Sequence, residues 1–371
     1  MKKIISIFIL AVMAVSCSFL DYNEYSGYDK DDVYESFDRV QKSLTHIYSH
    51  VPTAYSTIDG AMRAAACDEA IYVNNLCSIY SMNDGSWSAS KTFDTRYGLY
   101  SAIRSINLFL EETKGEEFDY LKNLEAYENY MAEFENYPYE ARFLRAYYYF
   151  ELMRRYKEVP IITEVLNEKD ANTLTRNSLD DVVEFIVSEC EVAQANLPVS
   201  FEKEVSQEVG RATKGAAMAL KARAALFEGT FRKYHAGSAF VPQDEQTFGE
   251  VTVSSEWFLK QAVEAAEKIM GKKSLYTGNT MGIASAAKNA SYREYFVLED
   301  ADPSETILAR AYRSDEAVTV RQGIQFNMKN GKRSATQRFV NHYLKTDGKA
   351  YTKAELATME YAAQFKSRDP R

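Results

Sequence analysis

Apolar side chains recur along most of the chain at the three- and four-residue spacing of an amphipathic helix. The clearest series comprises Val33, Phe37, Val40, Leu44, Ile47 and Val51. These residues fall on one helical face, so a helix is predicted over 33–51. Similar patterns predict helices over about 96–111, 139–156, 178–197 and 213–229, and around Phe258, Ala262, Ala265 and Ile269. The pattern is therefore typical of a mainly α protein.

Two of these helices have clear end signals. Ser178 is the predicted N-cap of the helix over 178–197, and Asp181 follows three residues later, which is the arrangement of a capping box. Pro198 ends that helix, and Pro160 stops the one over 139–156, because proline cannot continue a helix.

Small residues characterise the helix over 213–229. They are Ala216, Ala217, Ala219, Ala222, Ala224 and Ala225. Small side chains let helices approach closely, and several helices of similar length alternate alanine with aromatic residues. This pattern predicts stacked helical hairpins of the tetratricopeptide kind. Long irregular segments over 68–94, 235–254 and 277–291 separate the helices, and loops of that length either bind something or are disordered.

The amino terminus has the features of a bacterial lipoprotein. Lys2 and Lys3 precede an apolar stretch over 4–15 that is too short to cross a bilayer, which predicts a signal peptide over 1–16. The stretch ends in AVSC at 14–17, so Cys17 is the predicted site of lipidation and residues 17–32 form a tether. The alternative is a plain secretory peptide followed by an incidental cysteine. No later stretch has the ~20 apolar residues of a transmembrane helix.

The net charge and the cysteine content narrow the range of possible functions further. The formal net charge of -9 argues against nucleic acid, whose binding depends on basic side chains. Beyond Cys17, the residues Cys67, Cys77 and Cys190 show no metal-type spacing, and either a disulfide between Cys67 and Cys77 or two buried thiols is expected. The 27 tyrosines and 20 phenylalanines exceed what a helical core needs and indicate aromatic side chains available for binding.

Six segments, taken in order, resemble the SusD/RagB family of outer-membrane nutrient-binding lipoproteins. They are CSFLD at 17–21, YSAIRSIN at 100–107, YEARFLRAY at 139–147, YKEVP at 156–160, GRATKGAA at 210–217 and FKSRDPR at 365–371. The resemblance covers essentially the whole chain.

This resemblance implies a tetratricopeptide-like α/α superhelix over 33–371, with long irregular loops and minor β structure. It implies a lipid-anchored protein exposed on the cell outer membrane that captures oligosaccharide and passes it to a SusC-like TonB-dependent transporter. Members of the family continue well beyond the motif at 368–371, so a C-terminally truncated domain is expected. Peptide capture by the same uptake system and a purely structural scaffold are the alternatives.

A glycan site needs aromatic faces for the C–H surfaces of sugars together with polar groups for their hydroxyls. The candidate ligand-binding residues are Asp68, Tyr72, Asn75, Tyr80, Asn83, Trp87, Arg96 and, in a second aromatic patch with Tyr295 and Phe296, Tyr292. Trp87 is the first choice because serines flank it in a polar loop, and packing over the helices is its alternative. Core packing is the favoured interpretation of the second patch.

Other conspicuous residues are assigned structural roles. The resemblance implies that Arg211 and Lys214 serve as caps and ion-pair partners. The run over 147–149 lies within a helix, so most of its three tyrosines are expected in the core. His46 and His50 are four residues apart, but no third metal ligand follows at a recognisable spacing.

No catalytic function is predicted. The chain contains no P-loop, G-x-G-x-x-G, H-E-x-x-H or G-x-S-x-G motif. A glycosidase needs only two suitably placed carboxylates, but pairs such as Glu116 and Glu117 are better explained as surface charge. The sequence predicts a binding protein without a cofactor or metal.

Overall fold

The computed structural model describes residues 28–52, 57–58, 61–72, 78–88, 90, 95–201, 210–248, 251–278, 290–296, 304–310, 333–335, 340–345, 347–360 and 363. Its longer helices are α3 (Phe37–Ser49), α5 (Leu99–Glu112), α7 (Tyr137–Tyr156), α9 (Leu179–Asn196), α10 (Lys214–His235) and α11 (Ser255–Glu267). The shorter ones are α2 (Lys30–Tyr34), α4 (Tyr80–Asn83), α6 (Tyr127–Phe134), α8 (Glu168–Ala171), α12 (Ala290–Tyr295) and α15 (Lys353–Thr358), with 3-10 turns η2 (Arg63–Ala66) and η3 (Asp119–Leu121).

Strands are short and lie outside the helical stack. In the described residues they form antiparallel pairs: β1 (Thr57–Ile58) with β2 (Ala61–Met62), β3 (Ala70–Tyr72) with β6 (Arg333–Ala335), and β4 (Gln246–Phe248) with β5 (Val251–Val253). The β3–β6 pair joins segments more than 250 residues apart, with Ile71 opposite Ser334. The prediction of a mainly α protein with minor β structure is confirmed.

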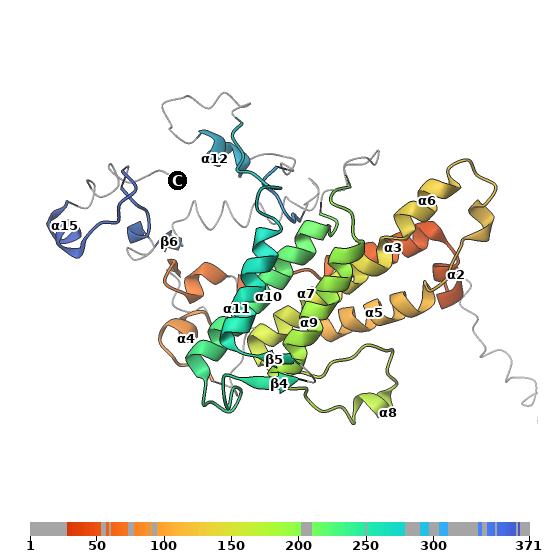
Figure 1. Ribbon diagram of the computed structural model, residues 1–371, viewed down its shortest axis with the longest axis horizontal. Coiled ribbons are helices and arrows are strands. Elements are labelled where there is room, and N and C mark those ends of the chain that lie inside the picture. Colours follow the sequence, from red (N-terminus) through yellow and green to blue (C-terminus); the bar gives the residue numbers. More distant parts are fainter. Residues whose placement is uncertain are drawn as a thin grey trace, which may run out of the picture.

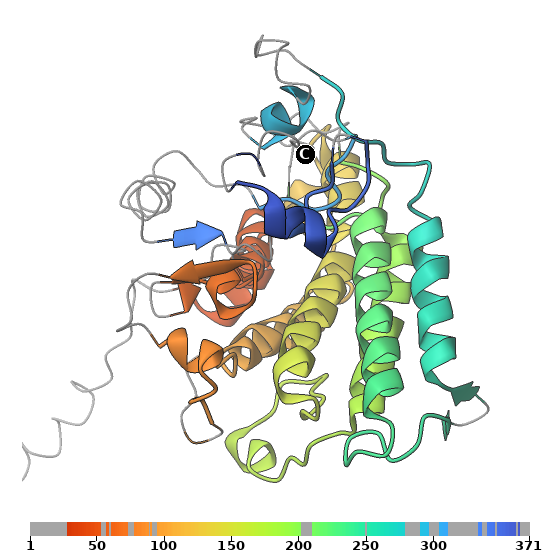
Figure 2. The same ribbon diagram turned by 90° about the vertical axis from the view of Figure 1, so that its left-hand side faces the viewer.

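The long helices form successive layers. Helix α3 packs on α5 and α7, α5 on α7, α7 on α9, α9 on α10, and α10 on α11. Figures 1 and 2 show α9, α10 and α11 side by side at one end of this stack. The predicted stacking of helical hairpins is therefore present in the structure.

The capping box at Ser178 is confirmed. The Ser178 side chain accepts a hydrogen bond from the Asp181 amide, and the Asp181 carboxylate accepts one from the Ser178 amide. The helix ends at Asn196, where Leu197 turns to extended backbone ahead of Pro198.

Two other predicted boundaries are wrong. The helix expected over 33–51 is divided into α2 and α3 because Ser36 adopts an extended conformation, and the freed Phe37 amide donates to the Tyr120 hydroxyl at 3.0 Å. Helix α10 continues six residues beyond Gly229, which does not act as a stop. A Cβ at this position would lie 2.8 Å from Leu259 Cγ, so the glycine permits close contact with α11.

One continuous core runs through the stack and is rich in aromatic side chains. Tyr148, Tyr149 and Phe150 are fully buried on α7, which confirms that most of the tyrosine run at 147–149 lies in the core. The Tyr148 hydroxyl donates to the Ile47 carbonyl at 2.5 Å and so fixes α7 to α3. Buried hydroxyls that keep a partner, as this one does, cost little on folding.

Cys67 matches neither expectation for the Cys67 and Cys77 pair. Cys67 is exposed and unpaired, and its Sγ donates to the Ala64 carbonyl at 3.3 Å. It therefore forms no disulfide with Cys77, which lies outside the described residues. Cys190 is buried within α9, and burial raises the pKa of its thiol.

A cluster of buried charge joins α9 to α10. Arg232 is fully buried, contacts the Asp180 carboxylate, and donates to the Asp244 carbonyl at 2.8 Å. Its Nε lies 3.0 Å from Glu228 Oε1, but in a direction that makes no hydrogen bond. Glu228 is fully buried, and burial raises its pKa to about 7, with the Lys157 ammonium acting in the opposite direction.

Stability should therefore fall as pH rises through the range where Glu228 titrates. Between its ordinary value of 4.5 and about 7 the unfolded chain loses this proton while the folded chain keeps it, which favours unfolding. Across this pH range the free energy of unfolding should fall by about 3 kcal/mol in total. Urea unfolding should find Glu228→Gln more stable than the parent by about that amount at pH 8, and nearly equal at pH 4.5. A less stable variant at pH 8 would instead show that Glu228 is an effective ion-pair partner of Arg232.

Candidate functional site

The segment over 61–88, which carries most of the candidate ligand-binding residues, folds around a small core of its own. Tyr72 ends β3 and is buried there with Ala65 and Ile79, and its carbonyl accepts a hydrogen bond from the Tyr80 hydroxyl. Tyr72 is thus a packing residue, and the half-buried Tyr80 holds α4 against β3.

Of the polar candidates in this segment, Asn83 supports the fold and Asp68 faces solvent. Asn83 ends α4 and its Nδ2 donates to the Ala65 carbonyl at 3.0 Å, which ties the helix to η2. Asp68 is exposed in the turn that follows η2. Asn75 lies outside the described residues.

Trp87 is exposed over 56% of its surface. Its amide donates to the Ser81 carbonyl at 3.2 Å, so the turn after α4 fixes its backbone. Gly85 within this turn has a φ of 76°, a left-handed conformation that glycine adopts without strain. More than half of the Trp87 surface is therefore accessible to solvent.

A stacked pair of tyrosines lies next to Arg96. The rings of Tyr97 and Tyr156 are 4.3 Å apart between centroids and within 12° of parallel. Tyr97 is 60% exposed, so its outer face is open to a ligand, whereas Tyr156 backs it from the end of α7. The Arg96 amide donates to the Tyr156 hydroxyl at 2.8 Å, which holds the two segments together.

Partly buried cation–π contacts and a hydrogen bond hold the backbone that follows Tyr156. Lys157 has a φ of 63°, and its ammonium lies over the rings of Phe227 and Phe231 at 4.5 and 4.4 Å from their centroids. Beyond it, the Ile162 amide donates to the Tyr149 hydroxyl at 2.7 Å. These contacts link the segment after Tyr156 to α7 and α10.

The sequence did not indicate the Tyr97–Tyr156 pair. Tyr97 is adjacent to the candidate Arg96, but its partner is 59 residues away at the end of a different helix. No local spacing links the two positions, because only the packing of α5 against α7 brings them together.

The second aromatic patch is partly described. Tyr292 lies in α12, where the structure describes its backbone only. Tyr295 packs edge-on against Phe296, which is 68% exposed, and its hydroxyl lies 3.0 Å from Thr306 Oγ1. Among the described side chains of this patch, the Phe296 ring is exposed.

A cavity of about 750 Å³ opens between α3 and α7, and the polar side chains of its lining include Arg211 and Glu140. Arg211 Nη2 donates to Glu140 Oε1 at 2.5 Å, and Nη1 donates to Glu133 Oε1 at 3.2 Å. The Tyr48 hydroxyl donates to Glu140 Oε2 at 2.6 Å and accepts from the Ala212 amide at 2.8 Å. The structure thus gives Arg211 the ion-pair role that the resemblance implied.

The histidine pair has a structural explanation. The rings of His46 and His50 meet edge to face, and His50 Nδ1 lies 3.1 Å from the His46 carbonyl. Among the described residues, no three histidine, cysteine or acidic side chains are grouped as metal ligands. Within that same part of the chain, no helix is both long enough and apolar enough to span a bilayer.

Comparison with known proteins identifies relatives of this architecture. A family model for SusD-like proteins, described as starch-binding and associating with the outer membrane, matches residues 18–226. No protein with a curated description matches the chain.

Solved structures share the fold. A SusD-like protein from Bacteroides fragilis is 21% identical with a TM-score of 0.66, and the match covers 92% of this chain and 60% of that one. A SusD-like carbohydrate-binding protein from the same species is 20% identical with a TM-score of 0.62, over 91% and 59%. A laminarin-binding SusD-like protein is 19% identical with a TM-score of 0.50, over 73% and 50%. The match therefore spans about 60% of the length of the first two.

Proposed function

Because this chain belongs to the SusD-like family of starch-binding proteins that associate with the outer membrane, we propose that it captures oligosaccharides at the cell surface without cleaving them. It passes them to a SusC-like TonB-dependent transporter. A lipid on Cys17, at the end of the signal peptide over 1–16, anchors it to the outer membrane, and residues 17–32 connect that anchor to the helical domain over 33–371.

The observation that carries this proposal is the open face of Tyr97 on its Tyr156 support. Sugar rings stack their C–H faces on flat aromatic rings, and a ring that is already fixed loses little conformational entropy when a ligand binds. Arg96 and the exposed Trp87 belong to the same inter-helix segment and add polar and aromatic groups. Such a surface binds a glycan along its length through several weak contacts.

The family description and one structural neighbour suggest the class of glycan. The family model is described as starch-binding, and one neighbour is named for binding laminarin. Starch and laminarin are both glucans. We propose a glucan oligosaccharide as the ligand, with Asp68 also contributing from its exposed turn.

Replacing Tyr97 with alanine should weaken oligosaccharide binding at least about tenfold, or about 1.4 kcal/mol, because the stacking face is lost. Calorimetric titration of the chain from Ser18 with maltoheptaose and laminarihexaose would measure this loss, and Trp87→Ala should reduce affinity in the same assay. Tyr28→Ala is the matched control, because Tyr28 is 70% exposed and lies two residues before Lys30, which pairs with Glu112 at the end of α5 opposite to Tyr97. A folded parent that binds neither sugar but binds peptides would contradict the proposal in favour of peptide capture.

A further inference from the structure

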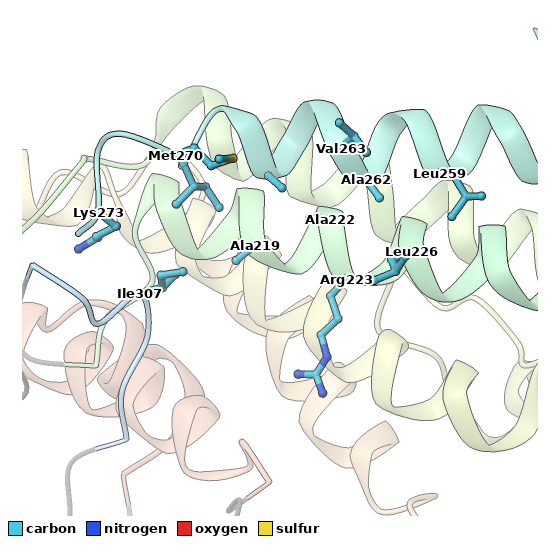
Figure 3. A pocket seen from close by; sticks show the side chains of 12 residues that line it. Ala219, Ala222, Arg223, Leu226, Leu259, Ala262, Val263, Met270, Lys273 and Ile307 are labelled. Atoms are coloured by element: carbon cyan, nitrogen blue, oxygen red, sulfur yellow. The ribbon is translucent and has the colours of Figure 1, made fainter. Parts of the chain in front are cut away.

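A cationic patch lies where the end of α7 meets the middle of α10. It consists of Arg154, Arg155, Lys157 and Arg223, in a chain whose formal net charge is -9. The Arg223 side chain points from α10 away from α11, as Figure 3 shows, and its guanidinium lies 5.5 Å from the centroid of the Phe150 ring on α7. The Arg154 guanidinium lies 5.3 Å from the centroid of the same ring. Cations from two helices therefore share one aromatic surface.

The patch holds more cations than its carboxylate can balance. Glu151 accepts hydrogen bonds from both Arg154, at 2.7 Å, and Arg155, at 2.8 Å. In the part of the chain that the structure describes, the side chains of Lys157 and Arg223 contact aromatic rings but form no ion pair and no hydrogen bond. The patch therefore carries an excess of positive charge.

The other acidic groups nearby leave this excess in place. Glu158 pairs with Arg176, at 3.7 Å between the carboxylate and the guanidinium. Glu228 is fully buried, and because burial raises its pKa to about 7 it adds little negative charge below neutral pH. Burial lowers the pKa of Lys157, and the Arg154 charge acts in the same direction, whereas Glu228 opposes both. Lys157 and Arg154 thus repel each other where water is partly excluded, and a bound anion would relieve that repulsion.

A hydroxyl without a partner lies among these cations. Tyr147 is partly buried on α7, and among the described residues its hydroxyl makes no hydrogen bond. Burial raises its pKa most, Glu151 raises it further, and the guanidinium groups of the patch act in the opposite direction, so all three are close enough to influence the hydroxyl. Guanidinium groups beside a free hydroxyl donor suit the oxygens of a carboxylate or a sulfate.

The backbone at Lys157 is held in a strained conformation. Its φ of 63° and ψ of -79°, with the Glu158 amide donating to the Tyr156 carbonyl at 2.8 Å, form a γ-turn that residues other than glycine rarely adopt. This turn directs Tyr156 toward Tyr97 and the next side chain toward α10. Strain of this kind is found where a ligand site requires a particular geometry. The patch therefore begins directly beside the proposed saccharide surface.

We propose that this cationic patch binds the carboxylate or sulfate groups of an acidic saccharide. Arg223 and Lys157 supply charge that no other group neutralises, and the Tyr147 hydroxyl donates a further hydrogen bond. The saccharide nature of the ligand rests on the proposed function, because the patch adjoins the Tyr97–Tyr156 pair, whereas the preference for an oxyanion does not. The range of ligands then extends beyond neutral glucans.

Tetragalacturonate, which carries a carboxylate on each sugar, is the probe, and its fully methyl-esterified form is the matched neutral ligand. Calorimetric titration of the chain from Ser18 at low ionic strength should show at least about tenfold tighter binding of the acid than of the ester. Arg223→Gln and Lys157→Gln should each weaken binding of the acid at least about tenfold. Arg104→Gln is the control and should bind the acid as the parent does, because Arg104 is exposed on α5, which packs on α3 and α7.

Equal binding of the acid and the ester would overturn the proposal. Equal losses in Arg223→Gln, Lys157→Gln and Arg104→Gln would also overturn it, because they would reflect net charge and not the patch. Inorganic sulfate is titrated as a third ligand, and if it binds at the patch while tetragalacturonate does not, the saccharide assignment is wrong. Arg223 is exposed and forms no ion pair among the described residues, so its variant should fold, which circular dichroism would verify.

Binding of maltoheptaose by the parent chain separates this proposal from the proposed function. A chain that binds maltoheptaose but does not distinguish the acid from the ester contradicts the anion site alone. A chain that binds the acid through Arg223 and Lys157 but binds no maltoheptaose supports the anion site and contradicts capture of a neutral glucan.

Discussion

Replacing Arg211 with methionine is expected to lower the free energy of unfolding by about 3–5 kcal/mol. The change leaves the fully buried Glu140 carboxylate close to Glu133 with no positive charge between them. The Arg211 guanidinium also lies over the Phe201 ring, 4.1 Å from its centroid, so the loss of stability includes this cation–π contact. Urea unfolding followed by circular dichroism would measure it.

The control for this experiment is an ion pair at the surface. Lys42→Met removes the pair with Asp38, both of whose side chains are more than two-thirds exposed, and should cost less than about 1 kcal/mol. The double variant Arg211→Met, Glu140→Gln should recover part of the stability, because it removes the uncompensated buried charge. If Arg211→Met and Lys42→Met lowered the free energy of unfolding equally, the buried network would contribute no more to stability than a surface ion pair.

Removing the Tyr148 ring is the second change with a large expected effect. Tyr148→Ala should cost about 3–5 kcal/mol, because it opens a cavity in a fully buried part of α7. Tyr148→Phe keeps the ring but removes the hydrogen bond to the Ile47 carbonyl, and should cost about 1 kcal/mol. Chemical denaturation of both variants separates packing from hydrogen bonding.

A comparison with the neighbouring Tyr147 tests whether burial sets this cost. Tyr147 lies on the same helix but is only partly buried, so Tyr147→Ala should be clearly less destabilising than Tyr148→Ala. If the two alanine variants lost the same stability, helix propensity and not cavity formation would be the cause.

Much of the fold could be predicted from local sequence signals. Apolar spacing located α5, α7 and α9, and the serine–aspartate capping box at Ser178 and Asp181 gave the start of α9. These features depend on residues within one or two turns of each other. The same reasoning placed one helix across 33–51, because the break at Ser36 depends on a hydrogen bond from Phe37 to the distant Tyr120.

The candidate site was less predictable for the same reason. An aromatic loop residue such as Trp87 can be recognised from its polar neighbours, and its exposure agrees with that choice. By contrast, the burial of Tyr72 depends on packing with Ile79 across a turn, and the stack of Tyr97 on Tyr156 depends on two helices meeting. Pairings of this kind leave no trace in a single sequence.

The Tyr48 hydroxyl has a consequence for how the chain folds. It links α3 to the Ala212 amide just before α10, across 164 residues, and also donates to Glu140 of α7. In an ideal solenoid each layer contacts only its neighbours and can form in sequence. Here the Tyr48 hydroxyl of α3 gains its full set of hydrogen bonds only after the segment around residue 212 has packed against it. The high contact order of this link should make the stack fold as a single cooperative unit, and slowly for a helical protein.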